Sequence, residues 1–257
     1  MTAPTADPQR LAAARQRLAA QGVVVLGEDH LLLGLDKAAG VLSQPGPQGE
    51  TSLVELVDAY RREAEGKPGR AFVGLVHRLD RNVSGAMVVA KSSKAASRLA
   101  AAFRGREGVE KVYLAWTSGV PRDERGTLRA MLVRDLVRRV TRVRDAGDDD
   151  DEGREAVLDY EVEARGDGVA RLRVRLRTGA PHQIRVQLAR EGWPLLGDAK
   201  YGGPPAPRAA RCDRPALHAR RLVVPHPVGG TPVVVDAPVP EDLLRLDRAL
   251  GLRPPAD

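Results

Sequence analysis

The sequence predicts an α+β chain with a mixed, largely antiparallel sheet and flanking helices. Three observations support this class. Residues 171–177 alternate strictly between arginine and an aliphatic residue, which is typical of a half-buried strand. Residues 93–104 carry apolar side chains at helical spacing. The 257 residues contain no internal repeat and no linker, which favours one domain in which strands and helices alternate irregularly.

The elements expected before the middle of the chain follow from apolar runs and turn residues. We expect a helix and two strands at 7–20, 23–26 and 31–35. Ser52 and Glu55 form a capping-box pattern, which predicts a helix from Ser52 to about Glu63. The apolar runs Ala71–Val76 and Ala86–Ala90 predict two strands on either side of a charged loop.

Later elements are predicted in the same way. A helix over Ser93–Arg104 should end at Gly105, and a strand should follow at Lys111–Thr117. Strands dominate residues 128–177, where Leu172, Val174 and Leu176 should face a core and the intervening arginines should face outward. Pro181 suits the first turn of a helix over His182–Glu191, and a last helix is expected at Glu241–Leu250.

Composition limits the class of protein. Lysine plus arginine number 41 against 34 acidic residues, a net charge of +7, and the single cysteine excludes a disulfide framework and a cysteine-built zinc site. No stretch is apolar enough for a membrane span, and the first residues do not have the pattern of a signal peptide. We therefore expect a soluble, cytoplasmic protein that has no membrane partner.

The charge is unevenly distributed. Residues 165–190 carry seven arginines and one acid, whereas residues 144–155 carry seven acids and two arginines. A concentrated basic face is typical of a protein that binds a phosphate backbone, although a solvated arginine face is the alternative. The acidic run is expected to be a solvated loop.

Two segments place polar clusters directly after predicted strands, where sites are commonly built. In Gly74–Gly85, Asp80 is a candidate nucleophile or general base, and Arg185 in Arg177–Leu188 supplies an opposite charge. A buried Asp80–Arg185 ion pair without chemistry is the alternative. His77, Asp80 and Ser84 could also suggest a hydrolase, but no G-x-S-x-G motif is present. No metal-binding histidine spacing and no P-loop occurs.

These residues resemble a known family. HRLDRNVSG, running into AMVVAKS, is similar to the H-R-L-D-x-x-[TV]-S-G signature of RluA-type RNA pseudouridine synthases, and RTGAPHQIRVQL is similar to a second family segment. Further matching segments, in family order, are LDKAAG at 35–40, KVYLA at 111–115, LLGDAKYG at 195–202, LHA at 217–219 and HP at 226–227. The resemblance spans about residues 23–240.

The resemblance implies a fold and an activity. The fold would be the pseudouridine synthase catalytic fold, with an active-site cleft across its sheet. The activity would be isomerisation of uridine to pseudouridine in a structured ribosomal or transfer RNA, without a cofactor or metal. The catalytic domain would occupy 23–257 after a helical extension at 1–22, without a separate N-terminal RNA-binding domain. A compact RNA stem-loop would then be the partner, bound by a monomer, and DNA is not expected to bind.

The resemblance also implies residue roles. Asp80 would be the catalytic aspartate, Tyr113 would stack on the uracil, and Arg185 would pair with Asp80. Arg78 would fill the gap left when the target uridine is flipped out, and Leu79 and Ile184 would wall the uracil pocket. Other substrate contacts are expected from His77, Arg177, His182 and Gln183.

Four positions depart from the family pattern: Ala38, Val83, Ala180 and Gln187 replace the more usual Pro, Thr, Arg and His. None is a predicted catalytic residue, so these departures affect RNA contacts and packing more than catalysis. A catalytically inactive RNA-binding protein of the same fold is the alternative function, and the presence of Asp80, Tyr113 and Arg185 argues against it.

Overall fold

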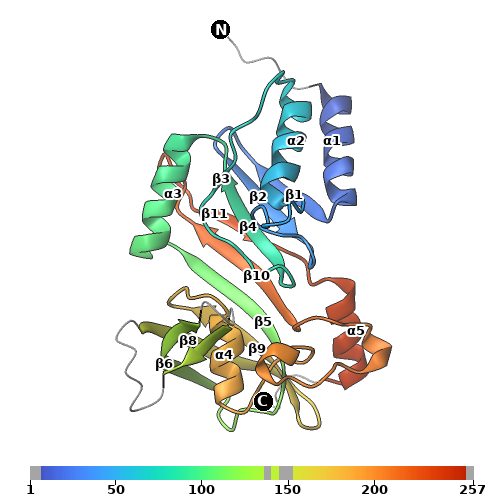
Figure 1. The fold of residues 1–257 in the computed structure, drawn as a ribbon, viewed down its shortest axis with the longest axis vertical. Helices are drawn as coiled ribbons and strands as arrows, with labels where there is room; N and C mark the ends of the chain where they lie inside the picture. The colour runs from blue at the N-terminus through green and yellow to red at the C-terminus, as the bar shows by residue number, and fades with distance from the viewer. Residues whose placement is uncertain (1–6, 136–139, 145–152, 253–257) are drawn as a thin grey trace. The chain divides into compact units, whose positions relative to one another are not determined.

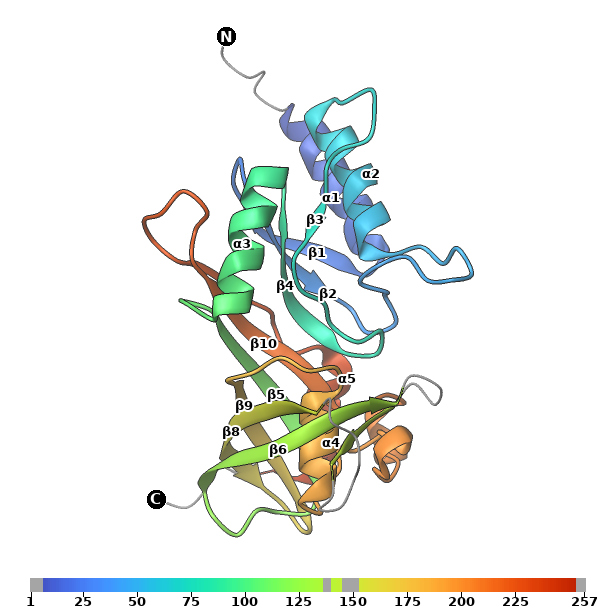
Figure 2. The same ribbon diagram turned by 60° about the vertical axis from the view of Figure 1, so that its left-hand side comes forward.

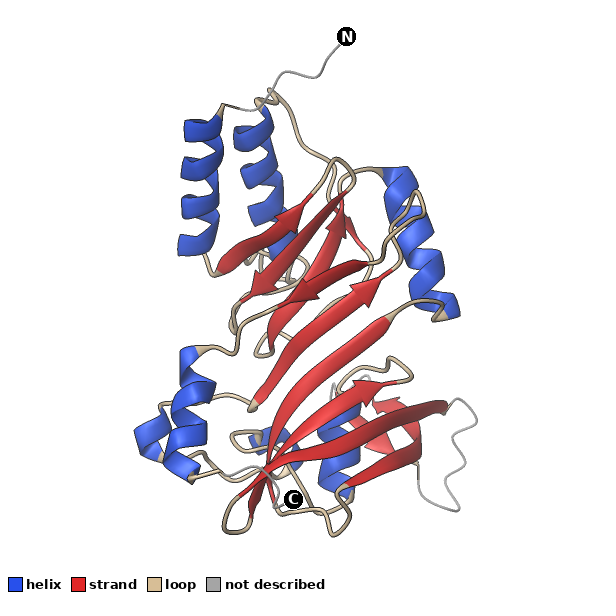
Figure 3. Ribbon diagram, turned by 180° about the vertical axis from the view of Figure 1, so that it is seen from behind, coloured by secondary structure: helices blue, strands red, loops and turns tan. Residues whose placement is uncertain are grey.

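The computed structural model describes residues 7–135, 140–144 and 153–252, which form two compact units (Figure 1). Unit 1 comprises Met1–Val109 and Arg221–Pro238, and unit 2 comprises Glu110–Arg220 and Val239–Asp257. Each unit contains helices and antiparallel strands, which confirms the α+β class (Figure 3). Most of the acidic run, residues 145–152, lies outside the described residues.

Unit 1 is built on antiparallel strand pairs. The pairs are β1–β2, β2–β4 and β3–β4, with β11 paired to β10. The strands are β1 (Val23–Glu28), β2 (Leu32–Lys37), β3 (Gly74–Leu75), β4 (Ser84–Ala90), β10 (Leu217–Val224, which continues from unit 2) and β11 (Val233–Asp236). The helices are α1 (Pro8–Ala20), α2 (Leu53–Glu65) and α3 (Ser93–Gly105).

The core of unit 1 joins segments that are far apart in the sequence. Leu32 on β2, Val88 on β4 and Leu99 on α3 share one buried cluster with Leu222 and Val235 from the second segment of the unit. On another part of the unit, α1 lies beside α2 (Figures 1 and 2). The predicted helix at 7–20 and strands at 23–26 and 31–35 are therefore confirmed, with ends shifted by a few residues.

Two predicted element ends in unit 1 were wrong. The expected strand Ala71–Val76 is reduced to Gly74–Leu75, because only these two residues pair with the end of β4. The helix expected to end at Gly105 includes that glycine, and the left-handed residue that follows it is Arg106, with φ of 62°. Of the two hydrogen bonds of the capping box predicted at Ser52, the one to the Glu55 side chain is present: the Glu55 carboxylate accepts from the Ser52 backbone N–H at 2.8 Å.

Unit 2 contains a second antiparallel ladder, in the order β5-β9-β8-β6-β7. Its strands are β5 (Glu110–Ser118), β6 (Arg125–Asp135), β7 (Val140–Val143), β8 (Arg154–Arg165) and β9 (Val169–Leu176). Its helices are α4 (Gln183–Arg190), α5 (Glu241–Leu250) and the short η1 (Ala199–Tyr201) and η2 (Arg208–Ala210). The helix α4 lies against β6 and β7 (Figure 2).

The alternation predicted for β9 is confirmed. Leu172 and Val174 are buried and Leu176 is half-buried, while Arg173 and Arg175 are exposed. The predicted start of the next helix was wrong, because Pro181 precedes α4 rather than lying in its first turn. His182 has a left-handed conformation with φ of 56°, so helical geometry begins only at the next residue. None of the described helices is long and apolar enough to span a bilayer.

Candidate active site

Asp80 lies in the loop that joins β3 to β4 in unit 1. The loop turns immediately after it, where the Val83 backbone N–H donates to the Asp80 carbonyl at 3.1 Å. Asp80 is half-buried, Leu79 is buried and Arg78 is exposed. Arg81, which follows Asp80, is also exposed, so the loop places the carboxylate between a buried side chain, Leu79, and an exposed one, Arg81.

A buried lysine holds the backbone that follows Asp80. Lys37 at the end of β2 is fully buried, and its Nζ donates to the carbonyls of Ala38, Val41 and Arg81 at 3.0, 2.9 and 3.2 Å. The Arg81 carbonyl also accepts from the Gly40 N–H at 2.8 Å. Since a buried ammonium group is stable only with its donors satisfied, Lys37 fixes this junction strongly. The LDKAAG segment is thus packed directly against the Asp80 loop.

His77 has two contacts within unit 1. Its Nε2 accepts a hydrogen bond from the Val88 backbone N–H at 3.0 Å, and its ring stacks on Phe103 with centroids 4.8 Å apart. Nε2 is thereby used to hold the loop against β4 and α3. This arrangement argues against a hydrolase in which His77 acts as the base, and its contact with substrate stays a prediction.

Arg185 on α4 forms a buried ion pair that the sequence did not assign. Its Nε and one terminal nitrogen donate to the two carboxylate oxygens of Asp198 at 2.7 and 2.6 Å. The side chains are 10% and 1% exposed. Two parallel charge-assisted bonds fix the guanidinium plane. Asp198 lies in the LLGDAKYG segment, so the signal was present in the sequence although its role was not recognised.

Tyr201 in the same segment covers the Arg185 guanidinium. The Arg185 Cζ lies 5.0 Å from the centre of the tyrosine ring. The Tyr201 hydroxyl lies 2.7 Å from His182 Nδ1 and accepts from the Thr141 backbone N–H at 3.0 Å. Burial raises the pKa of Tyr201, so the phenol stays neutral. The structure therefore brings His182 and Arg185 together around a tyrosine that sequence reasoning missed.

Gln183 and Ile184 are both buried at the start of α4. The Gln183 Oε1 accepts from Thr178 Oγ1 and from the Ala180 N–H at 2.9 and 3.1 Å, and its Nε2 donates to the Val157 carbonyl at 3.2 Å. These contacts tie the loop before α4 to β8. They give Gln183 a structural role, and its contact with substrate stays a prediction.

The arginines of β9, and Arg177 directly after the strand, have acidic partners. Arg177, a predicted RNA contact, donates to Asp159 at 2.6 Å while remaining 55% exposed. Each of the other three also pairs with an acid: Arg171 with Glu163 and Asp247, Arg173 with Glu163, and Arg175 with Glu110. The basic stripe of the sequence is therefore largely neutralised over residues 171–177.

The predicted catalytic residues are distributed over the two units. Asp80 belongs to unit 1, whereas Arg185 and Tyr113, half-buried on β5 opposite Val174, belong to unit 2. The predicted Asp80–Arg185 pair stays a prediction. Among the described residues, no group of three or more His, Cys, Asp or Glu side chains is arranged to hold a metal ion.

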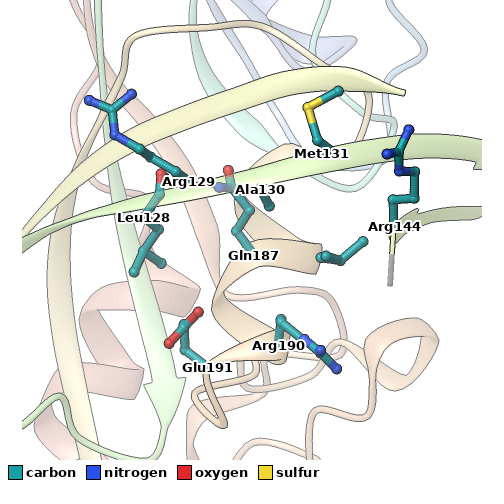
Figure 4. Close-up of a pocket in the computed structure, with 9 residues that line it drawn as sticks. Leu128, Arg129, Ala130, Met131, Arg144, Gln187, Arg190 and Glu191 are labelled. Atoms are coloured by element: carbon teal, nitrogen blue, oxygen red, sulfur yellow. Dashed lines mark hydrogen bonds between the residues drawn. The ribbon is translucent and has the colours of Figure 1, made fainter. Parts of the chain in front are cut away.

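Unit 2 also contains a cavity of about 360 Å³ between α4 and the β6–β7 strands (Figure 4). No predicted catalytic or substrate-binding residue lines it, but Gln187 does. The Gln187 Nε2 donates to the carbonyls of Ala156 and Leu128 at 3.1 and 3.3 Å. Gln187 thus joins α4 to β8 and β6.

Comparisons with known proteins identify the family. A family model described as RNA pseudouridylate synthase matches residues 31–190. Ribosomal large subunit pseudouridine synthase D of Xanthomonas campestris is 37% identical over 242 residues, covering 88% of this chain and 69% of the relative. The protein of the same name from Pseudomonas aeruginosa is 37% identical over 235 residues, covering 86% and 70%.

Solved structures agree with the fold. The human RNA pseudouridylate synthase domain containing 4 matches 96% of this chain and 99% of its own with a TM-score of 0.78 at 23% identity. The human domain containing 1 matches 91% and 97% with a TM-score of 0.65 at 25% identity. The chain belongs to the RNA pseudouridine synthase family and is an isomerase, as the motifs predicted.

Proposed function

We propose that this enzyme converts one or a few uridines of large-subunit ribosomal RNA to pseudouridine, with Asp80 as the catalytic carboxylate. The names of the Xanthomonas and Pseudomonas relatives support ribosomal RNA over the transfer RNA that the motifs also allowed. Identity of 37% over most of the chain supports a shared substrate class. Cytoplasmic location stays a prediction.

The chemistry needs only groups that this chain carries. Uridine and pseudouridine are isomers: the C1′–N1 bond breaks, a C1′–C5 bond forms, and the proton lost from C5 is balanced by one gained at N1. No oxidant or reductant enters this balance. A carboxylate can attack carbon or move a proton, so Asp80 can serve either step. Tyr113 would lie against the uracil, and Arg185 would bind the Asp80 carboxylate.

The observation that carries the assignment of Asp80 is the set of hydrogen bonds that hold the backbone next to it. The Arg81 carbonyl accepts from both Lys37 Nζ and the Gly40 N–H, and the Arg81 side chain donates back to the Gly40 carbonyl at 3.2 Å. A catalytic group must be held close to its reactive geometry, and a loop anchored in this way supports that demand.

Arg78 is the predicted RNA contact that the structure favours most. It is exposed, it is two residues from Asp80, and no acidic partner is found for it among the described residues. We propose that it enters the RNA stack when the target uridine leaves it. Leu79 and Ile184, both buried, would contact the uracil only through part of their surface.

Pseudouridine mapping at single-nucleotide resolution tests the function. Total RNA would be compared from cells that carry the wild-type protein, no protein, or Asp80→Asn. We expect one or a few ribosomal positions to be lost in both altered strains, while purified Asp80→Asn folds and still binds RNA. Positions lost only in transfer RNA would overturn the substrate class. No lost position, with RNA binding intact, would favour the inactive RNA-binding alternative.

A second experiment tests the compact target. Purified enzyme would be offered the mapped site in an isolated stem-loop and in assembled ribosomal subunits. A monomer that recognises a stem-loop should modify the isolated RNA at a comparable rate. Modification of assembled subunits alone would contradict the stem-loop proposal and leave the ribosomal substrate intact.

A further inference from the structure

Ser43 makes an unusual pair of contacts with the residue before Asp80. Its hydroxyl donates to the Leu79 carbonyl at 2.7 Å and accepts from the Leu79 backbone N–H at 3.2 Å. Ser43 and Leu79 are both buried, at 5% and 6% exposure. One short side chain thus satisfies both backbone groups of Leu79.

This contact completes the anchoring of the Asp80 loop. Lys37 and Gly40 hold the carbonyl of Arg81, on one side of Asp80, and Ser43 holds Leu79 on the other side. All three holding residues come from the segment 37–43, which begins at the last residue of β2. With the peptides on both sides fixed, the position of the Asp80 carboxylate depends on its own side-chain rotation alone.

Only the hydroxyl of Ser43 can form the two hydrogen bonds with the Leu79 backbone. An alanine at this position would leave a buried N–H and a buried carbonyl without their partner, and each would be driven to find water or a new partner by moving the loop. Displacement of a catalytic group by about 1 Å can cost a large factor in rate. Ground-state binding of RNA, in contrast, uses groups spread over the protein surface.

We propose that Ser43 is a positioning residue for the isomerase reaction, acting through Leu79 on the Asp80 carboxylate. The inference rests on the proposed function, in which Asp80 is catalytic. It predicts a loss in kcat rather than in KM, because the hydroxyl orients the reacting group and does not touch RNA.

The test measures pseudouridine formation by Ser43→Ala and Ser43→Thr on a purified RNA substrate. For Ser43→Ala we expect kcat to fall about ten-fold while KM stays within about two-fold of wild type. Ser43→Thr keeps the hydroxyl and should recover most of the lost kcat. Amide hydrogen exchange at Leu79 should be at least about ten-fold faster in Ser43→Ala, since its acceptor is gone.

Ser52→Ala is the matched control. Ser52 is also a buried serine of unit 1, but its Oγ has no hydrogen-bond partner among the described residues. Its replacement should leave kcat unchanged. Wild-type kcat in Ser43→Ala, an equal loss in Ser52→Ala, or no recovery in a folded Ser43→Thr would each overturn the proposal.

Two further variants keep the result decisive. If Ser43→Ala melts below the assay temperature, Ser43→Cys replaces it, because a thiol forms weaker hydrogen bonds than a hydroxyl. We expect Ser43→Cys to have a kcat below that of the wild type. A wild-type kcat in this variant would contradict the positioning role of Ser43. Asp80→Asn is assayed alongside. If it keeps activity, the assignment of Asp80 fails; if it is inactive while Ser43→Ala is fully active, only the inference about Ser43 fails.

Discussion

Arg185 is held by Asp198, which lies thirteen residues later in the chain. This ion pair determines how much a substitution of either residue lowers the free energy of unfolding. Asp198 is 1% exposed, and its two carboxylate oxygens receive two guanidinium nitrogens. Breaking a buried ion pair leaves one charge without its counterion in a poorly solvated place. The neutral amide of asparagine accepts at one oxygen only.

We therefore expect Asp198→Asn to lower the free energy of unfolding by about 3 kcal/mol and to lower kcat by loosening Arg185. Asp159→Asn is the control, because Asp159 pairs with an arginine that is 55% exposed. That change should cost less than about 1 kcal/mol. Urea unfolding of both variants checks this, and equal losses in the two would contradict the argument.

For single residues, the sequence predicted which side chains belong to the candidate site better than it predicted which of them contact each other. Asp80, Tyr113 and Arg185 came from motifs, and the predicted Asp80–Arg185 pair stays a prediction. Asp198 and Tyr201 stood in a recognised segment, yet nothing in the spacing shows that they surround Arg185. Ser43 had no signal at all, because a buried serine is recognisable as a backbone anchor only when its partner is known.

At the scale of elements, the loop that carries Asp198 and Tyr201 depends on a close backbone approach. A Cβ added at Gly203 would lie 1.9 Å from the Leu195 carbonyl oxygen. The Gly203 N–H also donates to the Asp198 carbonyl at 2.9 Å. The neighbouring Gly202 has φ of 79° but open space around its Cβ position. The two glycines are therefore required for different reasons.

Gly203→Ala should force the loop apart, cost about 3 kcal/mol or more and reduce activity through Asp198. Gly202→Ala should lower the free energy of unfolding by only about 1–2 kcal/mol, the cost of a left-handed alanine. Its activity should stay at the wild-type level. Thermal unfolding and kcat of the two variants check the contrast. If Gly202→Ala were the more damaging change, the steric argument would be wrong.

A polar cluster centred on Glu28 joins α1, α2 and the residue after β4 to β1 in unit 1. Glu28 on β1 accepts from Arg15 of α1 at 2.7 Å, from Tyr60 of α2 at 3.0 Å and from Lys91 after β4 at 3.1 Å. Burial, together with the Glu28 carboxylate, raises the pKa of Tyr60 to about 12, even though Arg15 opposes the shift. The neutral phenol is therefore the form that the fold stabilises.

Tyr60 should make stability fall in alkaline solution. In the unfolded chain its pKa is near 10, so its contribution is complete below pH 10 and is lost as pH rises towards about 12. Tyr60→Phe cannot titrate, so the difference in unfolding free energy between wild type and Tyr60→Phe should shrink over that range. Urea unfolding at pH 8, 10 and 11 checks this. A constant difference would contradict the role of the phenol.

Elements were predicted more accurately than their ends. The last helix has the expected bounds Glu241–Leu250, and β9 has the expected faces. The end of α3 was missed by one residue because Arg106, not a glycine, adopts the left-handed conformation that ends it. The start of α4 was missed because His182 does the same. Non-glycine residues in this conformation leave little trace in a sequence.

At the scale of the whole molecule, the two-unit organisation had no sequence signal. The chain leaves unit 1 after Val109 and returns to it at Arg221, in the middle of β10. Leu222 and Val235 then complete the core that Leu32 and Val88 began. A boundary inside a strand has no linker and no glycine run that a sequence pattern could reveal. The catalytic domain expected at 23–257, after a helical extension at 1–22, stays a prediction.

Charge is another property of the whole molecule, and the sequence gives its total but not which arginines are paired with acids. The net charge of +7 predicts that RNA affinity falls as salt rises, because phosphate contacts release counterions. The number of arginines does not give the number of such contacts, however. Arg175 lies 2.7 Å from Glu110, and a phosphate near it would meet an arginine already accompanied by a carboxylate. Arg78 forms no ion pair with an acidic side chain among the described residues.

The salt dependence of binding should therefore separate these two exposed arginines. Arg78→Ala should reduce the slope of log affinity against log salt concentration by about 1, as expected for one lost phosphate contact. Arg175→Ala should change it by much less, because Glu110 already occupies Arg175 and we expect no phosphate contact to be lost. Filter binding of a mapped substrate RNA at several salt concentrations measures both slopes. Equal changes would mean that RNA displaces Glu110 from Arg175, and the whole β9 stripe would then count as RNA-binding surface.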